Sequence, residues 1–345
     1  MSKTLFICTD GTWNTADQRD DGVLAPSNVA RMARMIQTVP DEQITWYDAG
    51  VGTQNWLDKI TGGAFGHGLF ENIQQAYRFV VENYRPGDRL VLFGFSRGAY
   101  TARSLAGLIT KVGILRKKYI SSISRVYEIY RDPNPVPGEI EQYHENFCHQ
   151  EREIHFLGVW DTVGALGIPL KSLNWITSWL YKFHDTRLSP RVSHAFHAIA
   201  IDEKRRSFVP TLWLSDNLSN DQVVEQRWFA GVHSDIGGGY KEKGLSDVTL
   251  SWMLDRLKEY SPSVQLDEEY IRQHIDPDYR DTLHESRTWM YIGSKVIPHV
   301  RNTQRPQACN QMVDKSVFQR IECEPCNYHP KNITSMENTP DDVFE

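Results

Sequence analysis

The sequence lacks long hydrophobic runs. None of its 345 residues falls in an apolar stretch of about 18 residues, the length that a membrane-spanning helix needs. The apolar run near the N-terminus, Leu5–Cys8, is too short for the hydrophobic region of a signal peptide. We therefore expect a cytoplasmic chain, apart from export by a route that uses no N-terminal signal.

Cysteine is scarce, and its five copies stand at positions 8, 148, 309, 323 and 326. An odd, scattered set does not suit a disulfide framework, so we expect reduced thiols. Cys323 and Cys326 have the spacing of zinc ligands, with Cys309 upstream and His329 downstream. Because zinc knuckles need two such pairs, we favour an exposed turn closed by Pro325 over a structural zinc. We expect no metal and no other cofactor.

Long basic runs, internal repeats and low-complexity segments are also missing. The formal net charge is -6, with 38 Lys and Arg against 44 Asp and Glu. This balance argues against a nucleic-acid partner, which is held by clustered cations. The 40% apolar and 24% charged residues are instead typical of a soluble globular enzyme. A small-molecule or lipid substrate fits this composition.

Short β-rich segments alternate with helical periodicity through the first two thirds of the chain. This alternation is typical of a mostly parallel sheet with helices on both faces. Helices are predicted to begin at Ser27 or Asn28, after the glycine-rich stretch 62–68, and at Ser246. The predicted strands are 3–9, 43–47, 89–95, 154–160, 208–214 and 225–231.

The pattern predicts one domain over residues 1–345 with insertions. Residues 115–150 are charged, aromatic and mostly helical, and we expect them to form part of a cap. A second cap segment is expected at 170–190, where Trp175 and Trp179 lie one helical turn apart. These tryptophans are candidates for a lid, for contact with a membrane surface or for core packing. Residues 261–345 are expected to be a loop-rich extension.

A nucleophile motif follows the most hydrophobic predicted strand. Residues 94–98 read Gly-Phe-Ser-Arg-Gly and lead into a helix of small residues. A sharp turn of this kind exposes a serine hydroxyl between strand and helix, and small residues on either side allow the two backbones to approach. Gly94 and Gly98 meet that demand, so Ser96 is the candidate nucleophile. The alternative is a structural turn flanked by glycines.

The base and the acid should lie after later strands, in the chain order serine, acid, histidine. His233 directly follows the predicted strand 225–231 and lies in a predicted flexible loop, whereas His194 and His197 fall in a segment that reads as helical. Asp161 ends the strand 154–160 and is the candidate acid. Packing of His233 is the alternative, and the rival acids are Asp202, Asp216 and Asp235.

An oxyanion hole should combine the backbone N–H of Arg97 with one from the loop after the first strand. Gly11 and Thr12 are placed for this, and the positive end of the helix after Ser96 adds to it. Asp10 is expected to support the turn by accepting from backbone N–H groups. A metal-binding role for Asp10 is the alternative.

Several long motifs resemble a known family. They are residues 8–14, 50–53, 94–103, 159–164, 200–203 and 231–240. In this order they resemble the uncharacterised α/β-hydrolase domain family that includes type VI secretion phospholipase effectors, over about residues 3–330. The resemblance implies an α/β-hydrolase fold, a triad of Ser96, Asp161 and His233, and activity on carboxylic esters such as phospholipid acyl esters.

We therefore expect a serine esterase or lipase, including the phospholipase A type, that works through an acyl-enzyme. Its partner would be a small-molecule or lipid ester. The triad does not select the leaving group, so a thioesterase or amidase is an alternative. A non-catalytic interaction module on the same scaffold is a third interpretation.

Overall fold

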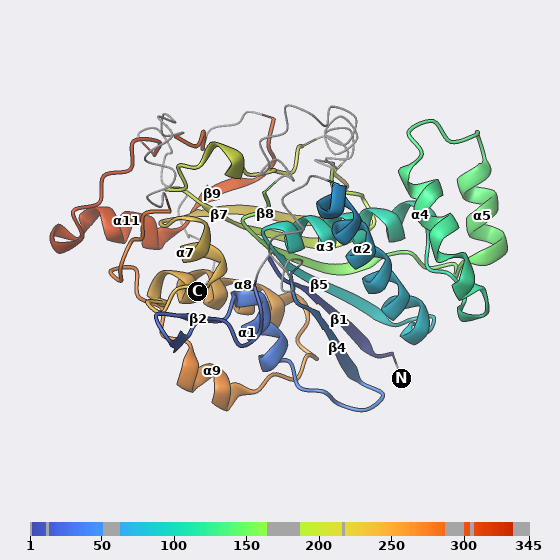
Figure 1. Ribbon diagram of the computed structural model, residues 1–345, viewed down its shortest axis with the longest axis horizontal. Helices are drawn as coiled ribbons and strands as arrows, with labels where there is room; N and C mark the ends of the chain where they lie inside the picture. Colours follow the sequence, from blue (N-terminus) through green and yellow to red (C-terminus); the bar gives the residue numbers. More distant parts are fainter. Residues whose placement is uncertain are drawn as a thin grey trace.

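A computed structural model describes residues 2–11, 14–50, 63–163, 187–215, 218–286, 300–303 and 307–333. Seven strands form one sheet in the order β4-β1-β5-β6-β7-β8-β9, and every neighbouring pair is parallel. Parallel strands need crossover connections, and helices provide several of these here (Figure 1). The strands are β1 (Thr4–Thr9), β4 (Gln43–Asp48), β5 (Arg89–Phe95), β6 (Ile154–Trp160), β7 (Val192–Ala200), β8 (Val223–Phe229) and β9 (Gln311–Val313). A separate short hairpin pairs β2 (Arg19–Asp20) with β3 (Val23–Leu24).

The sheet is buried on both faces. Along β1, Leu5 and Ile7 point into one apolar cluster, and Phe6 and Cys8 point into another. Because successive side chains of a strand point to opposite faces, a strand with consecutive apolar residues must be covered on both sides. All six residues of β1 are buried. The continuous apolar runs of the sequence therefore correspond to central strands.

Helices cover both faces, as the sequence predicted. The cluster that holds Leu5 also holds residues of α2 (Gly63–Asn83) and α3 (Arg97–Val112), and the opposite cluster holds residues of α1 (Asn28–Met35) and α8 (Gly244–Tyr260). Of the two positions at which this helix was predicted to begin, Ser27 is the N-cap, because its hydroxyl accepts from the N–H of Ala30 at 3.1 Å.

Residues 115–150 are helical in the structure. They contain the 3-10 helix η2 (Lys117–Ser122), α4 (Ile123–Arg131) and α5 (Glu139–Phe147). A single bridge between Leu115 and Cys148 closes the base of the segment. Figure 1 shows α4 and α5 at one end of the molecule, beyond α2 and α3. The cap role of this segment stays a prediction, and Trp175 and Trp179 lie outside the described residues.

Three local predictions are wrong. His194 and His197 lie in strand β7, where each pairs across to both β6 and β8. Residues 208–214 do not form the predicted strand: Phe208 ends the 3-10 helix η4 (Arg206–Phe208), and the rest pairs only through isolated bridges, one at Pro210 and two at Leu214. His233 is not in a flexible loop, because it begins the short helix α7 (His233–Gly237).

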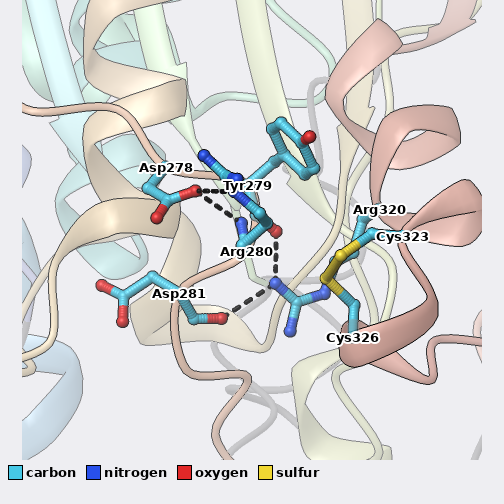
Figure 2. Close-up of a disulfide and its surroundings, with 7 residues drawn as sticks. All are labelled: Asp278, Tyr279, Arg280, Asp281, Arg320, Cys323 and Cys326. Carbon is cyan, nitrogen blue, oxygen red and sulfur yellow. Dashed lines mark hydrogen bonds and ion pairs between the residues drawn. A yellow bond between two sulfur atoms is a disulfide. The ribbon is translucent and has the colours of Figure 1, made fainter.

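The C-terminal part contributes to the sheet. After α9 (Glu268–His274), β9 pairs with β8 and precedes α11 (Lys315–Glu322) and the 3-10 helix η5 (Glu324–Cys326). The expectation of five reduced thiols is wrong for one pair, because Cys323 and Cys326 form a disulfide between α11 and η5 (Figure 2). The other three cysteines are free and buried.

The parallel sheet, the helices on both of its faces and the strand–turn–helix unit of β5 and α3 make this an α/β-hydrolase fold. Within the described part of the chain, no helix combines the length and apolar character needed to cross a membrane.

Candidate active site

Ser96 lies in a strained turn between β5 and α3. Its φ of 57° and ψ of -117° place it in a backbone conformation that non-glycine residues rarely adopt. The flanking glycines explain how the turn closes. A Cβ on Gly94 would lie 2.6 Å from the Cα of Ala99, and a Cβ on Gly98 would overlap the backbone oxygen of Thr9. Both positions therefore require glycine.

The end of β1 holds this turn in place. The Thr9 hydroxyl donates to the backbone oxygen of Phe93 or of Gly98, at 3.1 and 2.7 Å. On the other side, the N–H of Ser96 donates to the backbone oxygen of Trp160 at 3.0 Å. The turn is thus bonded to both neighbouring strands, which restricts its movement.

Gly11 lies directly against Ser96. A Cβ on Gly11 would be 3.3 Å from the Cβ of Ser96, so the loop after β1 is beside the serine, as predicted. The N–H of Gly11 donates to Oδ1 of Asp10 at 2.7 Å. The N–H that the sequence assigned to the oxyanion hole is therefore engaged by the Asp10 side chain in this structure, where it supports the turn. Thr12 lies outside the described residues, and Arg97 begins α3.

The Asp10 carboxylate accepts four hydrogen bonds and is buried. Oδ1 accepts from Gly11 and from the Asn14 amide, at 2.7 and 3.2 Å. Oδ2 accepts from the hydroxyls of Ser27 and Tyr47, at 2.6 and 2.7 Å. Burial raises the pKa of Asp10, and these bonds oppose the rise. Within the described ranges, no cluster of three metal-ligating side chains forms around it or elsewhere.

Asp161 and His233 form a buried hydrogen-bonded pair. Nδ1 of His233 lies 2.6 Å from Oδ2 of Asp161, and the two residues are 5% and 0% exposed. Asp161 follows β6, and His233 comes four residues after the end of β8. Because the carboxyl ends of parallel strands meet at one edge of the sheet, both residues lie on the same side of it as Ser96.

Two opposing effects act on each partner. Burial alone would raise the pKa of Asp161, but the charge of Arg301 and the hydrogen bond with His233 hold it well below its usual range. Burial lowers the pKa of His233, and the bond and charge of Asp161 only partly oppose this. The pair therefore combines an ionised carboxylate with a neutral imidazole at neutral pH.

The imidazole of His233 is enclosed by two aromatic rings. The ring centroids of Phe95 and Phe208 lie 4.6 and 4.9 Å from that of His233. The backbone N–H of His233 donates to Oε2 of Glu203 at 3.3 Å. Glu203 is itself buried and is paired with Arg205, whose guanidinium stacks on the Phe208 ring at 3.5 Å. Glu203 falls within the motif 200–203, for which no role was predicted, and Arg205 falls in no motif.

Arg301 is the second partner of Asp161. Its Nη1 lies 2.6 Å from Oδ1 and its Nη2 lies 2.9 Å from Oδ2, a two-pronged contact with the carboxylate. The two residues are 140 positions apart. Arg301 falls in the segment predicted to be a loop-rich extension, where no motif or periodicity marked it.

The rival acids have other partners. Asp202 accepts from the N–H of Gly231 and from the Tyr328 hydroxyl, both at 2.8 Å. Asp235 pairs with His284, whose Nδ1 lies 2.6 Å from Oδ1. Asp216 lies outside the described residues. Among the three of these acids that the structure describes, Asp161 is the one in contact with the His233 ring.

Known proteins share parts of this chain. The family model described as "T6SS, Phospholipase effector Tle1-like, catalytic domain" matches residues 3–256, a range that includes Ser96, Asp161 and His233. The uncharacterised protein YEL023C of Saccharomyces cerevisiae is 29% identical over 231 residues, which are 60% of this chain and 32% of that protein. The chain thus spans about a third of this curated relative.

Two solved structures are also similar. An uncharacterised protein from Pseudomonas aeruginosa matches with a TM-score of 0.50 and 17% identity, over 81% of this chain and 49% of that one. The Tle1 effector bound to the VgrG spike of the type 6 secretion system matches with a TM-score of 0.36 and 22% identity, over 70% and 52%. By the extent of the family match, this chain belongs to the family of Tle1-like type VI secretion phospholipase effector catalytic domains.

Proposed function

We propose that this protein is a serine esterase or lipase that cleaves carboxylic esters through an acyl-enzyme, with phospholipid acyl esters as its substrate class. One observation carries the proposal. A serine at the strained strand–helix turn shares a sheet edge with a buried histidine, whose Nδ1 is 2.6 Å from a carboxylate. These three groups have the roles of nucleophile, base and acid in acyl transfer.

In the acylation step, the Ser96 hydroxyl oxygen attacks the ester carbonyl carbon. His233 accepts the hydroxyl proton on Nε2, because Asp161 holds the Nδ1 proton on the other side of the ring. Asp161 stays ionised and stabilises the imidazolium that forms. The imidazolium then gives its proton to the leaving alcohol oxygen as the C–O bond breaks, which leaves an acyl group on Ser96.

In the deacylation step, water replaces the alcohol. His233 takes a proton from the water as its oxygen attacks the acyl carbon, and returns that proton to the Ser96 oxygen as the acid leaves. Negative charge develops twice on the carbonyl oxygen. We assign the Arg97 N–H to its stabilisation, together with Thr12 as the candidate second donor, since the Gly11 N–H bonds to Asp10.

Two observations support a lipid substrate. The family model is that of a phospholipase effector. The Phe95 and Phe208 rings pack against His233, so two of the side chains beside the proposed base are apolar. On a phospholipid the products would be a fatty acid and a lysophospholipid.

The test is hydrolysis of a panel of short acyl esters and phosphatidylcholine or phosphatidylglycerol vesicles, with the released products identified by mass spectrometry. We expect Ser96→Ala to lose the activity. Ser104→Ala is a matched control, since Ser104 is equally buried, 6% exposed, on α3. Full activity in Ser96→Ala would overturn the mechanism, and inactivity of the wild type on every ester would overturn the function.

A further inference from the structure

Arg301 is a buried cation whose contacts converge on one carboxylate. It is 1% exposed and pairs with both oxygens of Asp161. Its remaining contacts are with backbone oxygens, those of Ala200 at 2.7 Å and of Phe208. Burying a guanidinium costs free energy, which only close pairing offsets. Its place beside the proposed catalytic acid therefore calls for an explanation.

We infer that Arg301 is a positioning residue of the triad: it fixes the plane of the Asp161 carboxylate and keeps the Asp161–His233 pair from taking up a proton at neutral pH. This inference rests on the proposed function. It extends the active site beyond residues 3–256, where the family match ends. It also assigns to the C-terminal segment a part in the reaction.

The geometry supports the orienting part of this role. Oδ1 of Asp161 accepts from Arg301 and from the Ala200 N–H at 3.0 Å, and Oδ2 accepts from Arg301 and from His233. Four donors fill the acceptor sites of an ionised carboxylate. Rotation of the carboxyl group would break at least two of these bonds. Oδ2 is therefore held toward Nδ1, which fixes the ring of His233.

The charges around the pair support the second part. Facing His233 are Asp161, Glu203 and Arg205, besides the rings of Phe95 and Phe208. Facing Asp161 are Arg301, His233 and the neutral His197, whose pKa burial lowers to about 3 and near which Arg103 lies.

Glu203 and Asp161 are balanced by Arg205 and Arg301. The charges of these four residues cancel, so a proton on His233 adds one uncompensated positive charge beside them. Without Arg301, the pair would carry an uncompensated negative charge, and protonation of either partner would become easier.

The test separates the effect of the positive charge of Arg301 from the effect of its two-pronged contact with Asp161. In protein labelled with ¹³C-histidine, the His233 ring resonance is assigned by its loss in His233→Gln and followed as a function of pH. We expect Arg301→Met to raise the titration midpoint by about one pH unit, and the acidic limb of kcat/KM to move upward with it. Arg301→Lys keeps the charge but not the two-pronged contact, so its midpoint should stay while kcat falls about tenfold.

Arg320 provides the matched control. It is 4% exposed, lies in α11 of the same C-terminal part and donates to the backbone oxygens of Tyr279 and Asp281, close to the disulfide (Figure 2). It contacts no residue of the proposed triad. Arg320→Met should lower stability, because the backbone oxygens of Tyr279 and Asp281 lose their donor, but should leave the His233 midpoint and the pH profile unchanged.

Three results would overturn the inference. The first is a His233 titration midpoint in folded Arg301→Met that equals that of the wild type. The second is an equal shift of this midpoint in Arg320→Met, and the third is a kcat in Arg301→Lys that equals that of the wild type. If Arg301→Met does not fold, the kcat of Arg301→Lys decides. The histidine titration does not depend on turnover, so it tests Arg301 even if Ser96→Ala shows that the proposed function is wrong.

Discussion

At the scale of single residues, the bond between His233 and Asp161 determines which ring nitrogen carries the proton. With Nδ1 bonded to the carboxylate, Nε2 is left as the acceptor that a general base needs. The proposed base therefore depends on the acceptor character of residue 161, and not only on its charge.

Asp161→Asn tests this dependence. An amide in place of the carboxylate would favour the wrong tautomer of His233 and lose the charge that stabilises the imidazolium, so we expect kcat/KM on acyl esters to fall about 10³-fold or more. Asp235→Asn is the control, because Asp235 makes an equally short bond to His284. It should retain most of the activity. Equal losses in the two variants would contradict the assignment of the acid.

The pH dependence follows from the direction of the shift in His233. Because burial lowers its pKa below the ordinary value of about 6.5, the neutral, active form persists to lower pH. We expect kcat/KM to rise with pH, with a midpoint below about 6.5, and to level off before neutrality. A measured midpoint well above this value would show that the imidazolium is stabilised more than its surroundings indicate.

At the scale of elements, the turn between β5 and α3 depends on close backbone approach. A Cβ at residue 98 would overlap the backbone oxygen of Thr9 on the neighbouring strand, which is not free to move. Gly98→Ala should therefore lower the free energy of unfolding by about 3 kcal/mol and abolish activity.

Gly87→Ala measures the effect of an unfavourable backbone conformation without any crowding of the added Cβ. Gly87 has a φ of 88° but nothing lies within 4 Å of an added Cβ, so the substitution should cost only about 1 kcal/mol. Urea unfolding of both variants measures the difference. If the two substitutions lower the free energy of unfolding equally, the close backbone approach at Gly98 does not matter to the turn.

The same elements show what the sequence could predict. Strand β5 and the turn after it were predictable, because a buried apolar run followed by Gly-x-Ser-x-Gly is a local pattern. Strand β7 was misread, since its alanines have weak strand preference and its pairing depends on β6 and β8, which come from other parts of the sequence. The three residues of β9 are too few for a periodic signal.

At the scale of the whole molecule, the C-terminal part adds strand β9 to the sheet and places Arg301 beside Asp161 of the proposed site. Strand β9 covers the edge of β8, Val317 of α11 packs in the cluster around Trp228, and Arg301 reaches Asp161. Contacts between residues 140 positions apart depend on the folded topology and leave no mark in the local sequence. This is why motifs predict a candidate triad but do not predict the arginine buried beside Asp161.

A chain that ends at residue 299 tests the importance of this part. It would lose Arg301, expose the edge of β8 and uncover Trp228, so we expect aggregation or poor solubility, and no esterase activity in any soluble fraction. Size-exclusion chromatography and ester hydrolysis measure the two effects. A monomeric, fully active truncated protein would show that the site is complete without the C-terminal part.

The most direct test of the central claim is covalent labelling of Ser96. A fluorophosphonate reacts with serines activated by a neighbouring base, and peptide mass spectrometry locates the adduct. We predict one adduct, on Ser96, that is absent from Ser96→Ala, strongly slowed in His233→Ala and unchanged in Ser104→Ala. An unlabelled wild type, or an adduct that persists in Ser96→Ala, would contradict the account.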